Sequence, residues 1–76
     1  MPKYNLVGVD GNAYSVMGYV SYAMRKEHYS REEIDAYLRD AMLSDYNNLL
    51  AVSADMVEKL NSKYQTEEDE EDEEDE

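Results

Sequence analysis

Apolar positions recur with a helical period over most of the chain. From Ala13 to Lys26 they stand three and four residues apart, which aligns them on one side of a helix. The same spacing returns over residues 31–42 and from about residue 44 to residue 63. The pattern predicts three helices, and their apolar stripes consist of Ala13, Val16, Met17, Val20, Ala23 and Met24, then Ile34, Tyr37, Leu38, Ala41 and Met42, then Tyr46, Leu49, Leu50, Met56, Val57, Leu60 and Tyr64.

Capping signals precede two of these helices. Ser30 and Glu33 have the spacing of a capping box, in which each side chain accepts a hydrogen bond from the other residue's amide. Asn12, or Asp10 through the turn, can accept from the first free amides of the first helix. We therefore expect the first two helices to begin next to these residues.

Two helix interiors contain residues that disagree with the pattern. Gly18 lowers helix stability by about 1 kcal/mol relative to Ala, so we expect another backbone to approach it closely. The third helix begins near Ser44 or Asp45, and Ser53 stands on its stripe where a larger apolar residue is expected. A break within Ala51–Asp55 is therefore an alternative to one continuous helix.

The residues before the first helix predict a short extended segment. Lys3–Val9 contains Tyr4, Leu6, Val7 and Val9 as apolar candidates, and the turn sequence Asp10–Asn12 follows it. Because a single strand leaves its hydrogen-bonding groups unpaired, this segment either packs as an arm on the helices or pairs with another chain.

Length and composition limit the fold. The chain has 76 residues and no cysteine, so disulfides and thiolate metal sites cannot stabilise it. The predicted fold class is mainly α, with residues 1–65 forming a small three-helix domain with a short N-terminal extended segment. Residues 66–76 are predicted to be a disordered acidic tail. We recognise no signal peptide and no membrane-spanning run, so the expected location is the cytoplasm.

The net charge of −12 is unevenly distributed along the chain. Ten of the 19 acidic residues form the uninterrupted run Glu67–Glu76, which leaves nine acids and seven bases elsewhere. In an extended chain this run rises about 3.3 to 3.6 Å per residue, close to the spacing of about 3.4 Å between phosphates in one DNA strand. Such a run repels nucleic acids and anionic membranes and attracts cationic surfaces. It is either a partner-binding segment or a tail that only keeps the protein soluble.

Catalytic and metal-binding patterns are weak. His28 is the only histidine, and no motif places a nucleophile or a second base beside it, so we interpret it as an exposed loop residue. Asp10 starts a sequence similar to a calcium loop, but Tyr14 occupies a ligand position. Gly8 and Gly11 have the spacing of a phosphate clamp without basic neighbours, so we interpret both as turn residues. We expect no enzyme activity, no cofactor and no metal site.

Acidic residues of the helical domain add to the candidate binding surface. Glu32, Glu33 and Asp35 fall in the first turn of the second helix, where the helix dipole also accounts for them. Asp40 and Asp45 have no such explanation. The predicted partner-binding residues are Asp10, Glu32, Glu33, Asp35, Asp40, Asp45, Glu67, Glu68, Asp69, Glu70, Glu71 and Asp72.

Three stretches resemble a group of small proteins from phages and mobile elements. They are LVGVDGNAY at Leu6–Tyr14, SREEID at Ser30–Asp35 and DYNNLL at Asp45–Leu50. The resemblance covers most of residues 5–50 and implies a phage origin without assigning a chemistry. In size, charge and helical character the chain is also similar to acidic DNA mimics of Bacillus phages, which inhibit the nucleoid protein HU.

This resemblance and the charge lead to one hypothesis and two alternatives. The hypothesis is a phage protein that mimics DNA and occupies the basic DNA-binding surface of an HU-like protein in the bacterial host, without binding nucleic acid itself. The first alternative is a helical adaptor that binds another host enzyme, such as RNA polymerase, through tyrosine and methionine side chains. The second is an assembly protein that pairs through Lys3–Val9.

Overall fold

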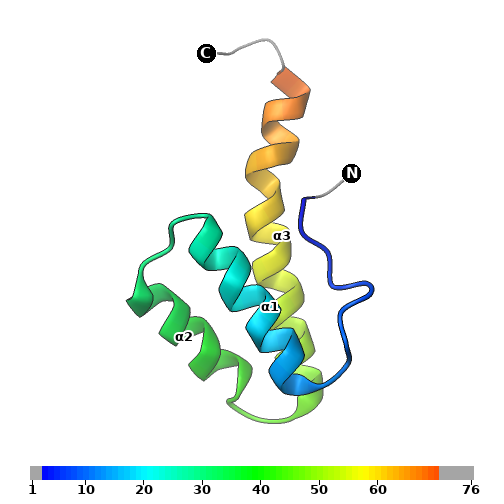
Figure 1. Ribbon diagram of the computed structural model, residues 1–76, viewed down its shortest axis with the longest axis vertical. Helices are drawn as coiled ribbons and strands as arrows, with labels where there is room; N and C mark the ends of the chain where they lie inside the picture. The colour runs from blue at the N-terminus through cyan, green and yellow to red at the C-terminus, as the bar shows by residue number, and fades with distance from the viewer. Residues whose placement is uncertain (1–2, 71–76) are drawn as a thin grey trace.

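The computed structural model describes the backbone of residues 3–70 and the side chains of residues 3–64, and its chain folds into three packed helices (Figure 1). These helices are α1 (Ala13–Lys26), α2 (Arg31–Ala41) and α3 (Tyr46–Glu70). Each helix contacts the other two, and α1 and α2 pack against the first part of α3. The predicted small three-helix domain is confirmed.

The predicted cap of α1 is confirmed, and its other end has an unexpected feature. The Asn12 side chain accepts a hydrogen bond of 2.8 Å from the Tyr14 amide. At the C-terminal end, the Tyr29 amide donates to the Met24 carbonyl oxygen, 3.0 Å away. This six-residue closure places His28 in the left-handed region with a φ of 69°. His28 is exposed, as expected, and it takes the helix-ending position that glycine usually occupies.

The starts of α2 and α3 are capped by side chains. Ser30 Oγ accepts from the Glu33 amide at 3.1 Å, and Glu33 Oε1 accepts from the Ser30 amide at 2.8 Å, which confirms the capping box. Asp45 Oδ1 accepts from the Asn48 amide at 2.9 Å and so caps α3. Local sequence signals thus determine where all three helices begin.

The third helix is continuous through Ala51–Asp55, so of the two alternatives the break is not observed. Ser53 is fully buried, and its Oγ lies 2.6 Å from the hydroxyl of Tyr37, which is also buried. Each hydroxyl therefore satisfies the other inside the core. The small size of Ser53 leaves room for the Tyr37 ring, which explains why a polar residue stands on the buried side of the helix.

The buried side of α3 also differs from the predicted stripe at its start. Tyr46 and Leu50 are exposed, and so is Met42 after α2, although all three were predicted to belong to the core. The core instead includes the polar side chains of Ser53 and Asn61, together with Tyr4, Val16, Met17, Val20, Ala23, Met24, Ile34, Tyr37, Ala41, Leu49, Val57 and Leu60.

Gly18 does not have the predicted role. It is exposed on α1, and a Cβ atom added there would meet no atom within 4 Å outside the local helix backbone. No other backbone approaches it, so the prediction of a close helix contact at Gly18 is wrong. Gly8 behaves as predicted, since it has a φ of 93° in a turn closed by the hydrogen bond from the Val9 amide to the Leu6 carbonyl, 3.0 Å.

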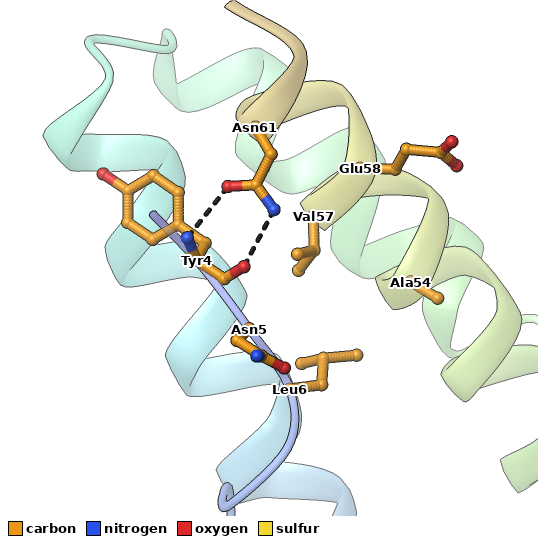
Figure 2. A pocket seen from close by; sticks show the side chains of 7 residues that line it. All are labelled: Tyr4, Asn5, Leu6, Ala54, Val57, Glu58 and Asn61. Carbon is orange, nitrogen blue, oxygen red and sulfur yellow. Dashed lines mark hydrogen bonds between the residues drawn. The ribbon is translucent and has the colours of Figure 1, made fainter. Parts of the chain in front are cut away.

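The N-terminal segment packs as an arm on the helices. Within residues 3–70 the structure has no strand, and the backbone of Tyr4 in the arm is instead paired with one side chain of α3. Asn61 Oδ1 accepts from the Tyr4 amide and Asn61 Nδ2 donates to the Tyr4 carbonyl, both at 2.8 Å (Figure 2). One amide side chain thus supplies the two hydrogen bonds that a neighbouring strand would supply. Of the two predicted arrangements, packing on the helices is the one observed.

The third helix is longer than the sequence pattern predicts. It spans 25 residues and ends at Glu70 rather than near Lys63. Figure 1 shows its last turns extending beyond α1 and α2. The predicted tail, residues 66–76, therefore begins within a helix, and its part from residue 71 onwards lies outside the described residues.

Candidate partner-binding surfaces

The first candidate surface is the acidic helix end, which we define as Glu67–Glu70 of α3. These four acidic residues follow one another on a helix that is continuous with the packed domain. A helix rises about 1.5 Å per residue, so the segment carries one negative charge for about every 1.5 Å of its length. Double-stranded DNA carries one for about every 1.7 Å of its axis. The linear charge density of the acidic helix end is therefore similar to that of a duplex and slightly higher.

Three of the predicted binding residues belong to segments that are joined near the opposite end of α3. The hydroxyl of Tyr46 donates to the Gly11 carbonyl, which joins the segment containing Asp10 to the start of α3. Asn48 Nδ2 donates to the Asp40 carbonyl oxygen at 2.8 Å, which joins the end of α2 to the same place. Asp10, Asp40 and Asp45 are all exposed there.

The remaining predicted residues lie elsewhere. Glu32, Glu33 and Asp35 are exposed at the start of α2, and Glu33 is engaged in the capping box. Glu67, Glu68, Asp69 and Glu70 form the acidic helix end, whereas Glu71 and Asp72 lie outside the described residues. Asp45 and the acidic helix end are separated by roughly 30 Å at about 1.5 Å per residue. The predicted residues therefore do not form one continuous patch.

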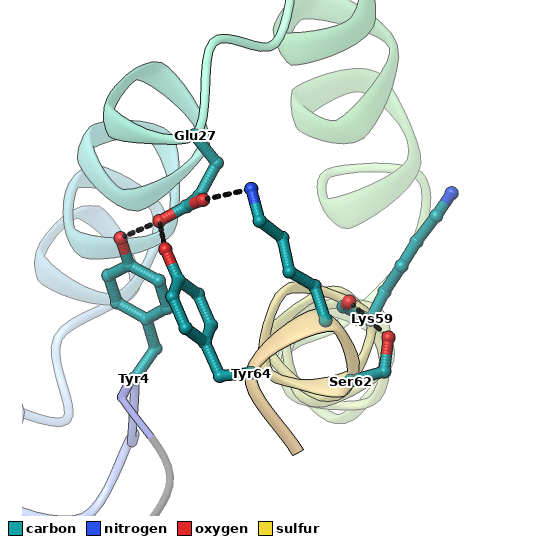
Figure 3. A network of polar contacts seen from close by, with 6 residues as sticks. Tyr4, Glu27, Lys59, Ser62 and Tyr64 are labelled. Atoms are coloured by element: carbon teal, nitrogen blue, oxygen red, sulfur yellow. Dashed lines mark hydrogen bonds and ion pairs between the residues drawn. The ribbon is translucent and has the colours of Figure 1, made fainter. Parts of the chain in front are cut away.

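A buried carboxylate that sequence reasoning missed organises a third region. The side chain of Glu27, at the C-terminal end of α1, is 7% exposed. Its Oε2 accepts hydrogen bonds from the hydroxyls of Tyr4 at 2.5 Å and Tyr64 at 2.6 Å, and its Oε1 pairs with Lys63 Nζ at 3.2 Å (Figure 3). We call Tyr4, Glu27, Lys63 and Tyr64 the Glu27 cluster. It joins the N-terminal arm, α1 and α3.

The hydrogen bonds of the Glu27 cluster shift the pKa values of its members. Those donated by Tyr4 and Tyr64 to the carboxylate lower the pKa of Glu27 from 4.5 to about 2, although burial acts in the opposite direction. Burial, followed by the hydrogen bond to Glu27, raises the pKa of Tyr4 above its usual value of 10.0. At neutral pH the cluster therefore holds one ionised carboxylate and a neutral Tyr4 hydroxyl. Its geometry is that of a structural connection, because every donor comes from the chain itself.

Among the described residues, no three His, Asp or Glu side chains stand close enough to hold a metal ion. In this part of the chain, no hydrogen bond joins the His28 side chain to a nucleophile. His28 lies in an exposed turn. None of the described helices is long and apolar enough to cross a membrane.

Comparison of the chain with protein-family models, with curated proteins and with solved structures finds no match. The resemblance to small phage proteins therefore stays a prediction from the three sequence stretches. The function has to be argued from the charges and surfaces of the protein itself.

Proposed function

We propose that this protein is a non-enzymatic DNA mimic, which binds the basic DNA-binding surface of an HU-like nucleoid protein and displaces DNA from it. The observation that carries the proposal is the course of α3. This helix continues without a break from the packed domain into the acidic run, so that Glu67–Glu70 are presented beyond the other helices.

The physical basis of the proposal is electrostatic. A protein that binds DNA mainly through phosphates gains affinity because its cations release counterions from the polyanion. An acidic helix of similar linear charge density offers the same gain to the same cationic surface. HU-like proteins are suitable partners, because they bind DNA through its backbone and deformability, with little dependence on base identity.

The helical domain would hold the acidic helix end in place and would add a smaller number of charges. Glu32, Asp35 and Asp40 are exposed on α2 and make no ion pair among the described side chains. Their separation from the acidic helix end means that a partner contacting both has to span much of the molecule. An origin in a phage rests on the sequence resemblance alone.

The test is competition for HU. Labelled duplex DNA bound to purified HU is titrated with the full chain at low salt, where we expect displacement. Direct binding of the full chain to HU, measured at low and at moderate salt, should weaken steeply as salt rises. A variant with Glu67–Glu76 changed to Gln and Asn keeps the length of the run and should require about a tenfold higher concentration. Residues 1–66 alone provide a second form without the run.

The matched control neutralises charge in the helical domain. Glu32→Gln, Asp35→Asn and Asp40→Asn remove three exposed charges and leave the caps at Glu33 and Asp45 intact. We expect a smaller effect from this variant than from neutralising the acidic run. Absence of displacement by the full chain at low salt would exclude HU as the partner.

The helical adaptor is the second candidate function, and a specific observation favours it. Several tyrosine, methionine and leucine side chains are exposed together where α2 meets α3. An interface built on them would lose little affinity between low and moderate salt, whereas the DNA mimic would lose much. The same salt titration therefore separates the two functions.

A further inference from the structure

Large apolar side chains are exposed together at one end of the domain. We define the apolar end as Tyr14, Met42, Leu43 and Tyr46, which lie where α1 begins, α2 ends and α3 begins. Tyr14 is 79% exposed, Leu43 78% and Met42 58%. Tyr14, Met42 and Tyr46 line a cavity of about 270 Å³, mostly apolar, whose lining also includes Met17, Asp45 and Leu49.

The cavity has a rigid floor and an open rim. Met17 and Leu49 form part of the buried core, so the floor is fixed by the fold. The rim residues Tyr14 and Met42 are mostly exposed to solvent. Burying one such side chain stabilises a protein by about 1.5 to 3 kcal/mol, so a domain this small loses considerable stability by leaving them exposed. Exposed apolar groups gathered in this way indicate an interaction site.

The connection between α2 and α3 strengthens this interpretation. Short turns are usually built from Gly, Pro, Asn, Asp and Ser, whose side chains favour tight backbone geometry. Here the turn begins with Met42 and Leu43, followed by Ser44 and Asp45. Neither of the two apolar residues belongs to the core cluster or to the residues packed against it. Their apolar character therefore does not serve the fold.

The charges around the apolar end indicate what kind of partner fits it. Asp45 lines the cavity, and Asp10 is held at the same end through the Tyr46 contact with Gly11. Neither carboxylate forms an ion pair with a base among residues 3–64. On the α2 side, Asp40 shares a neighbouring hollow with Asp55 and Lys59, where positive and negative charge are more nearly balanced.

We infer that the apolar end is a docking site for a basic amphipathic segment of a partner protein. An apolar side chain of that segment enters the cavity between Tyr14 and Met42, and its lysine or arginine residues lie against Asp10 and Asp45. Amphipathic helices bind apolar grooves in this manner through side chains on one face. A second copy of this chain fits poorly, because it would bring the same carboxylates face to face on molecules with a net charge of −12.

This inference goes beyond the proposed function. It concerns the end of α3 opposite the acidic run, and it does not require that the partner be a nucleoid protein. It also adds a contact that salt weakens little, since apolar burial persists where exposed charge pairs are screened. A partner with both a basic surface and a basic amphipathic segment could then engage both ends of α3.

The experiment uses the full chain with labelled methionine methyl groups, read by NMR. Met17 and Met42 line the cavity. Met24 is buried in the core and Met56 lies on α3 outside the cavity lining, so Met24 and Met56 serve as internal references. The probe is a helical peptide with leucine on one face and lysine on the other. We expect it to shift the Met17 and Met42 signals saturably and to leave the Met56 signal in place.

Two control peptides separate the cavity from the acidic run. A peptide with serine in place of leucine keeps its attraction to the run but should not shift Met17 or Met42. A peptide with glutamate in place of lysine keeps the apolar face and should bind at least about tenfold more weakly. If the lysine peptide leaves Met17 and Met42 unshifted, or if the glutamate peptide binds equally well, the inference is wrong.

Variants of the apolar end complete the test. Tyr14→Ser should weaken peptide binding about tenfold, as measured by the shift at Met17, since it removes a large exposed side chain from the contact surface. Asp45→Asn keeps a helix-capping side chain and should weaken binding about twofold to fivefold. Tyr22→Ser changes an exposed tyrosine outside the cavity lining and should have no effect.

Self-association is the competing outcome. If the Met42 signal shifts with protein concentration alone and the molecular mass doubles, a second copy occupies the apolar end and the inference is overturned. The proposed function fails separately, through the DNA competition with HU, so that either idea can be rejected while the other stands.

Discussion

The side chains at the two ends of α1 differ in burial and in polarity. At its C-terminal end, Glu27 is nearly enclosed and accepts three contacts from Tyr4, Tyr64 and Lys63. At its N-terminal end, Tyr14 projects into solvent beside an open apolar cavity. About 20 Å of helix, at about 1.5 Å per residue, separates the two.

The difference shows which side chains the fold needs for its stability and which it does not need. In the Glu27 cluster, polar groups join the N-terminal arm to α1 and α3, so that removing the Glu27 carboxylate takes away the acceptor of the buried Tyr4 hydroxyl. At the apolar end, Tyr14, Met42 and Leu43 are mostly exposed, and the Tyr46 hydroxyl binds the exposed carbonyl of Gly11 rather than a buried group. We therefore expect changes in the Glu27 cluster to lower stability strongly, and changes at the apolar end to affect binding instead.

Glu27→Ala is expected to have the largest effect on stability. It leaves the buried hydroxyl of Tyr4 without its acceptor, and the free energy of unfolding should fall by about 2 to 4 kcal/mol. Urea denaturation measures the change as a lower midpoint. The control is Glu58→Ala, an exposed acid on α3, which should alter stability by less than about 0.5 kcal/mol. Equal midpoints for the two variants would contradict a structural role for the cluster.

Acidic pH should remove the contribution of the Glu27 cluster to the stability of the fold. The folded pKa of Glu27 is depressed to about 2 from 4.5, so its contribution to stability is present above pH 4.5 and is lost as the pH falls towards 2. Thermal unfolding of the wild type and of Glu27→Gln across this range tests the point. The acidic run is protonated in both proteins, so the wild type should lose more stability than the variant. Parallel curves would show that Glu27 is not responsible.

The buried pair of hydroxyls should give an intermediate effect. Tyr37→Phe and Ser53→Ala are each expected to lower the free energy of unfolding by about 1 to 2 kcal/mol, because each leaves one buried hydroxyl unsatisfied. The double variant removes both groups and should lose less than the sum of the two. A double-mutant cycle measures this coupling, which we expect to be about 1 kcal/mol. Strict additivity would mean that the hydrogen bond contributes nothing.

The apolar end should show the smallest effect on stability. Tyr14→Ser and Leu43→Ser change side chains that are mostly exposed, so each should alter the free energy of unfolding by less than about 0.5 kcal/mol. Met17→Ala, at the buried floor of the same cavity, is the contrasting variant and should lower it by about 2 kcal/mol or more. A large loss of stability in Tyr14→Ser would assign this surface to the fold.

Local patterns in the sequence were sufficient to predict the three helices and the caps of α1 and α2. Ser30 and Glu33 are three residues apart, and the apolar spacing of α1 requires no knowledge of other segments. Ser53 was interpreted as a possible break because its partner, Tyr37, stands 16 residues earlier. A polar residue on an apolar stripe has two explanations, and only the packing of two helices distinguishes them.

The Glu27 cluster could not be predicted for the same reason. Its hydrogen bonds join residues 23 and 37 positions apart. One signal was present, because Glu27 ends α1 where the helix dipole disfavours an acid, which indicates compensation from elsewhere. The apolar end also left a signal, since Met42 and Leu43 are large apolar residues within a turn. The periodic pattern instead assigned Met42 to the core.

The acidic helix end places negative charge where a helix is already negative. The carbonyl groups of the last turn of α3 and the successive acids at Glu67–Glu70 repel one another, so this stretch of helix is stabilised poorly by the chain itself. A bound cationic surface relieves both repulsions at once. Helix formation in the last turn and binding of such a partner are then linked, and each favours the other by the same free energy. The strength with which the acidic run holds a partner would thus also determine how far the helix extends.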